Sequence, residues 1–234
     1  MPFTNFPSIF DWLERFAPYQ GMPAVYMLLA TAILIVIFYD WRLLIASLAT
    51  QYFFAALLFA TILDPRLATI KLLTGWFICL MLYITARQIN WGQLPPDVAP
   101  HDINPSANPR WAWLGPVRPP LSLPFRILLT LIMALTVWVI GQNPQYKLPN
   151  VPDLTFNLAI FALLGLGLLG LGLTTEPLKA GLGLLMFITG FELFYNGSQQ
   201  SIALLLFLTT SKLFLTLVIC YLVQIRYNWT RLLT

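Results

Sequence analysis

Seven long apolar stretches constrain this chain more than any other feature of its sequence. Each resembles a membrane-spanning helix, which needs roughly 20 mostly apolar residues. The stretches are Met22–Tyr39, Leu43–Leu63, Leu67–Arg87, Phe125–Gln142, Leu154–Thr174, Leu178–Asn196 and Ser201–Arg226. Apolar residues make up 59% of the chain and charged residues 9%, whereas a soluble domain has about 25% charged residues. We exclude a soluble enzyme and a disordered chain, and predict an all-α integral membrane protein, a bundle of about seven transmembrane helices.

Short polar turns and two longer segments divide the predicted bundle into five parts. These are an interfacial N-terminal segment (1–21), three helices (22–87), a loop (88–124), a fourth helix with an outer loop (125–153), and three final helices (154–234). The first and third parts are the ones that are not predicted to cross the bilayer.

Both non-spanning segments leave an alternative open. Ile9–Phe16 is either a helix that lies on the bilayer surface or a frayed tail. The loop Gln88–Pro124 holds nine of the eighteen prolines, which block regular structure. Its tryptophans and arginines favour the headgroup layer. We interpret it as a cytoplasmic loop that lies on the membrane and faces a partner, with a plain linker as the alternative.

The distribution of lysine and arginine predicts the orientation, because cytoplasmic loops carry the excess of these residues. One side carries Arg42, Arg87, Arg110, Arg118, Arg126, Lys179, Arg226 and Arg231. The other carries Arg15, Arg66, Lys71 and Lys147. We therefore expect the N-terminus outside and the C-terminus in the cytoplasm of a multi-pass protein of the inner (plasma) membrane.

The sequence offers few ligands for a metal or cofactor. Cys79 and Cys220 lie in apolar stretches without a second thiol or a histidine at ligand spacing. We expect no cofactor and no metal, and the net charge of +4 is too spread out for nucleic acid. One alternative stays open: Asp97, His101 and Asp102 would be the metal ligands of a membrane enzyme that acts on lipid-linked substrates.

Three charged residues fall inside predicted spans, where each charge costs about 2.5–3.5 kcal/mol. Lys212 lies about 16 Å from the nearer helix end, so we expect it to face other helices or internal water. Glu192 lies in the outer half of its helix, and Lys71 lies about one turn inside its own. Glu192 and Lys212 belong either to a proton path or to a structural ion pair, in which Glu192 pairs with Lys212 or Lys71. For Lys71 we favour a side chain that reaches the membrane surface.

Other polar and small residues predict helix packing. We expect Gln51 and Asn157 to form hydrogen bonds between helices. Small residues let membrane helices approach closely, which predicts tight packing of the fifth and sixth spans. The glycines concerned are Gly165, Gly167, Gly170, Gly172, Gly181, Gly183 and Gly190. The GxGxxG letters among them lack the preceding strand of a dinucleotide site.

The last third of the chain, Leu154–Tyr227, resembles the three-helix K subunit of bacterial respiratory NADH:quinone oxidoreductase. It is also similar to the hydrogenase-4 E subunit and the Mrp antiporter C subunit. The similar features are the glycine-containing helix at Gly165–Gly172, the turn at Thr174–Lys179, the Gly190-Phe191-Glu192 run and the central Lys212, where subunit K has a glutamate. The resemblance implies a non-catalytic subunit of a larger ion-translocating complex.

From the residues and the resemblance together, we expect a membrane subunit of a proton-translocating redox or antiporter complex. Its partners would be other membrane subunits and the lipid bilayer. Glu192 and Lys212 would contribute to the proton path, and redox chemistry would belong to other subunits. The alternative is a stand-alone transporter of a small solute or lipid.

Overall fold

The computed structural model describes residues 15–88, 122–149, 151, 153–198 and 201–228, and its regular structure in these ranges is helical. The long helices are α2 (Met22–Ile37), α3 (Trp41–Ile62), α4 (Pro65–Gln88), α5 (Ser122–Gln142), α6 (Leu154–Gly172), α7 (Pro177–Ser198) and α8 (Ile202–Asn228). Two single-turn helices, η1 (Ala17–Tyr19) and η4 (Pro144–Tyr146), precede α2 and follow α5.

A helix lies at each of the seven stretches, with ends within about three residues of those expected. Within the described ranges, six of them are long and apolar enough to cross a membrane, which makes this a multi-pass membrane protein. The exception is α2, which has 16 residues. Most of Ile9–Phe16 and nearly all of Gln88–Pro124 lie outside the described residues.

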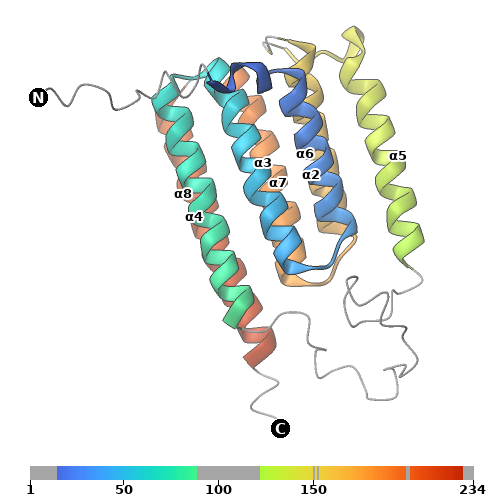
Figure 1. Cartoon of the computed structure of the whole chain (residues 1–234), viewed down its shortest axis with the longest axis vertical. Coiled ribbons are helices and arrows are strands. Elements are labelled where there is room, and N and C mark those ends of the chain that lie inside the picture. Colours follow the sequence, from blue (N-terminus) through green and yellow to red (C-terminus); the bar gives the residue numbers. More distant parts are fainter. Residues whose placement is uncertain (1–14, 89–121, 150, 152, 199–200, 229–234) are drawn as a thin grey trace, which may run out of the picture.

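The helices form two layers in the same chain order (Figure 1). One layer holds α2, α3 and α4, and the other holds α6, α7 and α8. Each helix packs on its counterpart across the layers, α2 on α6, α3 on α7 and α4 on α8, while α5 packs beside α6 and α2. We name the two ends of the bundle by residues in their turns, the Asp64 end and the Glu176 end. The helices α2, α4, α6 and α8 run from the first end to the second.

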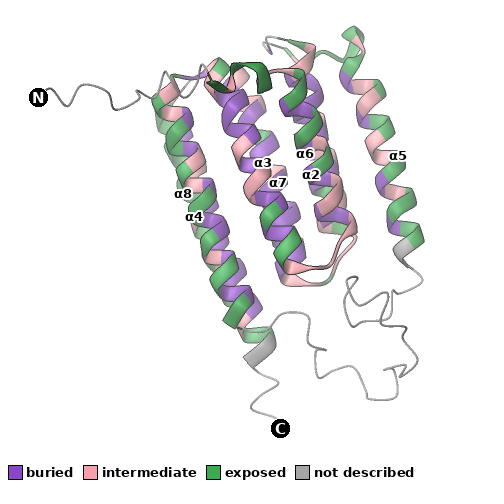
Figure 2. Ribbon diagram, in the orientation of Figure 1, coloured by how far each residue is buried: buried purple, intermediate pink, exposed green. Residues whose placement is uncertain are grey.

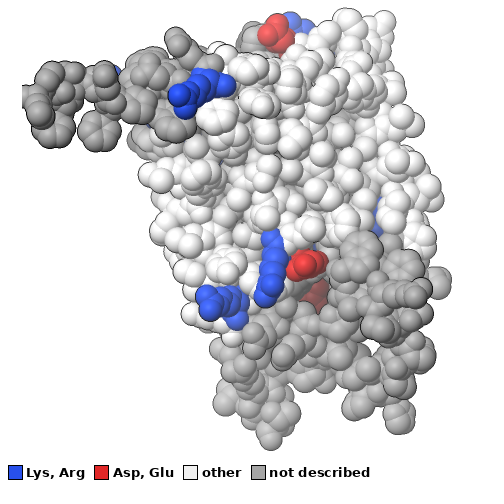
Figure 3. All heavy atoms as spheres, viewed as in Figure 1, with Lys and Arg blue, Asp and Glu red and all other residues white. Residues whose placement is uncertain are grey.

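The surface of the bundle suits lipid. Exposed residues follow α4 and α5 along much of their length, and the buried residues face the neighbouring helices (Figure 2). Large apolar side chains such as Leu73, Leu131 and Phe214 are exposed. On the face in Figure 3, charged side chains gather toward the two ends and leave a broad uncharged band between them. This is the pattern expected where hydrocarbon surrounds the middle of a bundle.

Local sequence explains how the first hairpin turns. The chain is extended at Phe38 and Asp40, and the Asp40 carboxylate accepts a hydrogen bond from the Arg42 backbone N–H at 3.1 Å, which caps α3. At the other end of α2, Gly21 has a φ of 81°, a conformation that favours glycine. It allows the chain to turn from η1 into α2.

Glycine brings α6 and α7 into backbone contact at three positions. A Cβ atom on Gly167 would lie 2.7 Å from the Phe187 backbone nitrogen, and one on Gly183 would lie 2.7 Å from that of Leu171. A Cβ on Gly190 would lie 2.8 Å from the Leu163 Cβ. These three glycines therefore allow the helix spacing, as a small-residue contact between membrane helices does.

The other four glycines do not bring the α6 and α7 backbones into close contact. Gly165 faces Met133 of α5, and Gly181 faces Ile219 of α8. A Cβ on Gly170 would make ordinary contacts at 3.5 Å or more, and one on Gly172 would meet nothing within 4 Å.

We expect Gly167→Ala to destabilise the protein, because its new methyl group meets backbone atoms that cannot move aside. Overpacking of this kind costs about 1–3 kcal/mol. The measurement is the thermal unfolding midpoint in detergent. Gly172→Ala is the matched control on the same helix and should be neutral or slightly stabilising. Equal midpoints for the two variants would contradict the close contact of α6 with α7.

Candidate functional site

Glu192 lies between two lysines in the interior of the bundle. Its Oε1 accepts a hydrogen bond from Lys71 Nζ at 2.9 Å, and its Oε2 accepts one from Lys212 Nζ at 2.5 Å. The exposed fractions of Lys71, Glu192 and Lys212 are 7%, 0% and 4%. We call these three residues the triad. It connects α4, α7 and α8, and so joins the two layers.

The directions of α7 and α8 explain why the side chains of Glu192 and Lys212 meet. At a rise of about 1.5 Å per residue, Glu192 lies about 9 Å and Lys212 about 15 Å from the Asp64 end of their helices. Side chains tilt toward the N-terminus of their own helix. Since α7 and α8 are antiparallel, Glu192 tilts away from the Asp64 end and Lys212 tilts toward it, and the two converge between these depths.

The surroundings of the triad are partly polar and partly aromatic. Lys212 Nζ also donates to the Thr189 hydroxyl at 3.1 Å. Its ammonium group lies 5.4 Å from the Tyr52 ring centroid, and that of Lys71 lies 5.5 Å from the Phe59 ring centroid. Aromatic faces at this distance attract cations. α3 therefore supplies the aromatic wall of the site.

A small cavity of about 10 Å³ adjoins the triad. Its walls include all three triad residues and the hydroxyl-bearing residues Thr74 and Thr209. A volume of this kind holds about one water molecule when polar groups surround it. The triad is therefore placed to exchange a hydrogen bond with internal water.

The expectation that Lys71 reaches the membrane surface is wrong. Its side chain is buried and bound to Glu192. The structure buries Ala68, Lys71, Gly75 and Ile78, which recur at helical spacing. The signal in the sequence was the small residues Ala68 and Gly75 on either side of Lys71, because small residues mark helix contacts in membranes.

Of the two polar residues expected to connect helices, only Asn157 does so. Its Oδ1 accepts from the Leu148 backbone N–H at 3.1 Å, and its Nδ2 donates to the Gly141 backbone oxygen at 3.2 Å. This side chain fastens the end of α5 to α6. The expectation for Gln51 is wrong: it is buried, but its amide atoms have no hydrogen-bond partner in the described part of the chain.

A second group of buried cations lies at the Glu176 end, where we expected them only as markers of the cytoplasmic side. Lys179 Nζ donates to the Phe38 backbone oxygen at 2.8 Å, and Arg126 donates to the Leu173 backbone oxygen. Both cations lie near the Tyr39 ring, at 3.8 Å and 5.0 Å from its centroid. Burial raises the pKa of the Tyr39 hydroxyl, and the nearby Arg126 charge acts in the opposite direction.

These two cations provide hydrogen-bond donors for backbone oxygens at helix ends. Phe38 and Leu173 follow the last residues of α2 and α6, where backbone oxygens lack partners and the helix dipole is negative. The signal for Lys179 was periodicity, since Lys179, Leu182 and Met186 share the buried stripe of α7. We interpret Lys179 and Arg126 as structural caps.

The described residues hold no group of three His, Cys, Asp or Glu side chains that would bind a metal ion. The alternative ligands Asp97, His101 and Asp102 lie outside the ranges that the structure describes. Comparisons with protein-family models, curated proteins and solved structures found no match for this chain.

The triad predicts an unequal response to the loss of its members. Glu192→Gln leaves two buried lysines without a counter-charge, and breaking a buried pair in this way costs about 3–5 kcal/mol. Lys71→Met leaves one lysine paired with Glu192, so its cost should be smaller. Thermal unfolding in detergent would compare the two variants, and a Glu192→Gln protein as stable as Lys71→Met would refute this charge balance.

Proposed function

We propose that the triad transfers protons within a non-catalytic subunit of a proton-translocating redox or antiporter complex. The observation that carries the proposal is the burial of Glu192 between Lys71 and Lys212. The described residues offer no metal cluster, and the electron transfer or ion exchange that drives the protons is assigned to other subunits. We assign the chain to the inner (plasma) membrane.

The charge of the triad supports this role. With both lysines protonated and the glutamate ionised, it carries one excess positive charge in the membrane interior, where a charge is costly. Release of one proton makes the triad electrically neutral. Lysine is suited to this exchange, because a buried ammonium group changes its protonation state readily. Glu192 contacts both amines and connects the two proton-bearing sites.

The same contacts also fit a structural clamp that holds α4, α7 and α8 together. The two roles differ in one chemical requirement. A clamp needs a cation that donates hydrogen bonds, whereas a relay needs a cation that gives up its proton. Arginine meets only the first requirement, because it is not deprotonated in proteins. A lysine-to-arginine substitution therefore separates them.

The proposal includes partners and a topology. The resemblance of residues 154–227 to subunit K supports assembly with other membrane subunits. Seven spans, with α2 as the first, would put the two termini on opposite sides of the membrane, and the lysine and arginine counts favour an outer N-terminus, so that the Asp64 end would face outward. The buried cations Arg126 and Lys179 lie at the Glu176 end, which agrees with a cytoplasmic Glu176 end.

We expect reporter fusions to confirm this topology. A reporter that is active only in the cytoplasm should work when fused after Thr234 and fail when inserted between Tyr146 and Lys147. A reporter active only outside should give the reverse pattern. Activity of one reporter at both positions would contradict the three spans α6, α7 and α8 that separate the two positions.

We expect Lys212→Arg to leave assembly intact and to stop proton transfer. The complex would be purified through a tag on this chain and reconstituted, and proton uptake would be followed with a pH-sensitive dye. Uptake should fall at least about ten-fold, as for the loss of a proton-transferring group, and Lys212→Met should also lose it. Lys147→Arg, at an exposed position outside the spans, is the matched control.

Full coupled uptake by Lys212→Arg or Lys212→Met would overturn the relay and leave the clamp. Transport of a solute by the purified chain alone, without partner subunits, would instead favour the stand-alone transporter.

A further inference from the structure

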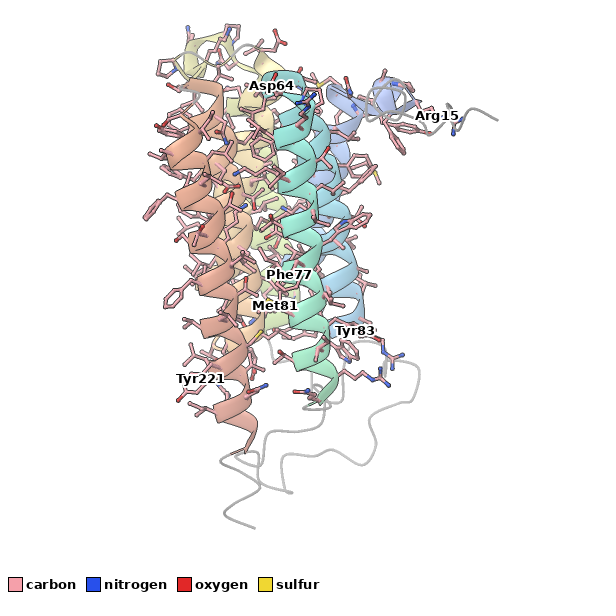
Figure 4. The ribbon with its side chains drawn as sticks, turned by 90° about the vertical axis from the view of Figure 1, so that its left-hand side faces the viewer. Arg15, Asp64, Phe77, Met81, Tyr83 and Tyr221 are labelled. Carbon is pink, nitrogen blue, oxygen red and sulfur yellow. The ribbon has the colours of Figure 1, made fainter. Side chains whose placement is uncertain are left out.

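A larger hollow opens at the Asp64 end of the bundle, close to the triad. It has a volume of about 310 Å³ and lies between the α3–α4 turn and the beginning of α8. Its walls include Asp64, Leu67, Asn196, Ser201 and Leu205. We call it the vestibule. Figure 4, in which α4 and α8 lie nearest the viewer, shows Asp64 at this end of α4.

The vestibule and the triad cavity are in register along three helices. On each helix, a residue of the vestibule wall lies four positions, or about one turn, from a residue of the triad cavity. The pairs are Leu67 and Lys71 on α4, Asn196 and Glu192 on α7, and Leu205 and Thr209 on α8. One helical turn therefore separates the two spaces along α4, α7 and α8.

Asn196 is an independent indication of a polar site at this turn. Its exposed fraction is 1%, and its Nδ2 donates to the Glu192 backbone oxygen at 2.8 Å. Its buried Oδ1 has no hydrogen-bond partner among the described residues. A buried amide oxygen without a partner is costly, and a water molecule in the vestibule would satisfy it.

The other side of the triad is mainly apolar among the described residues. Toward the Glu176 end, the same stripes of α4, α7 and α8 present the buried apolar side chains of Ile78, Leu185 and Ile219. The Thr216 hydroxyl, one turn from Lys212, is used in a hydrogen bond to the Lys212 backbone oxygen. The vestibule, one turn from the triad, lies on the opposite side, at the Asp64 end.

We propose that the vestibule is the aqueous entrance that connects the triad with the solution at the Asp64 end. Water between Asn196 and the triad cavity carries protons to and from Glu192 and Lys71. The carboxylate of Asp64 lines the mouth and raises the local concentration of cations. The purpose of the entrance rests on the proposed proton transfer, but its hydration is a separate property with its own measurement.

The neighbouring residues Thr209 and Thr210 provide a matched test. Both hydroxyls donate to the backbone oxygen four residues earlier, each at 2.8 Å. Thr209 lines the triad cavity, whereas Thr210 is exposed on the outer surface of α8. Each would be changed to cysteine in the full chain, after Cys79→Ala and Cys220→Ala remove the two native thiols.

Silver ion, a membrane-impermeant thiol-reactive cation small enough to follow a path of single water molecules, would be added to either face of sealed vesicles. From the Asp64 face, Thr209→Cys should react at least about ten-fold faster than Thr210→Cys, because only a hydrated thiol ionises and reacts. A further Asn196→Leu substitution should slow the reaction at position 209, since it fills the vestibule. Leu205→Cys and Leu206→Cys form a second matched pair nearer the mouth, for use if the deeper variants do not fold.

Equal rates within both pairs, or reaction only from the Glu176 face, would overturn the entrance. The result is separable from that of Lys212→Arg. Labelling of Thr209→Cys together with full activity of Lys212→Arg would keep the entrance and discard the relay. Absence of labelling together with an inactive Lys212→Arg would discard the entrance and keep the relay.

Discussion

The attraction between one carboxylate and two ammonium groups is the constraint on which the rest of this bundle depends. Glu192 is the only buried carboxylate in the described ranges, and it binds Lys71 of the first layer and Lys212 of the second. Without these contacts, three charges in the membrane interior would each cost about 2.5–3.5 kcal/mol. The helices must therefore keep the depths and rotations at which the side chains meet. The glycine contacts between α6 and α7 fix the position of the helix that carries Glu192.

Buried cations serve two different purposes in this protein. At the Glu176 end, Lys179 and Arg126 bind backbone oxygens at the ends of α2 and α6, where a positive charge meets the negative end of the helix dipole. In the triad, the partners of Lys71 and Lys212 are side chains, and the positive charge exceeds the negative charge by one. The first pair faces the partial negative charges of two helix ends, whereas the second pair contacts a carboxylate that touches both ammonium groups. The triad thus brings one acid and two amines into direct contact, and the proposed proton transfer rests on this arrangement.

The amino-acid sequence predicted the helices well and the site only in part. The length of each apolar stretch predicted a helix, because a helix must be long enough to cross the bilayer. The free-energy cost of a buried charge drew attention to Glu192, Lys71 and Lys212. The outward placement of Lys71 was wrong because it relied on the distance to the helix end and not on the small residues Ala68 and Gly75 on either side of it. That Glu192 binds both lysines depends on the rotation of three helices about their axes. The sequence also did not predict which helix of one layer packs on which helix of the other. These pairs join segments far apart in the chain, and the short turns between neighbouring helices do not determine them.

The lengths of α2 and α8 have a consequence for the surrounding lipid. α2 has 16 residues and α8 has 27, or about 24 Å and 40 Å along their axes, whereas the hydrocarbon core of a bilayer is about 30 Å thick. The bundle is thus too short for an undisturbed bilayer at the exposed face of α2 and too long at the exposed face of α8. Acyl chains must compress beside α2, and beside α8 they must stretch or the helix must lean. The protein would carry a wedge-shaped annulus of lipid, and membrane thickness would influence where it resides.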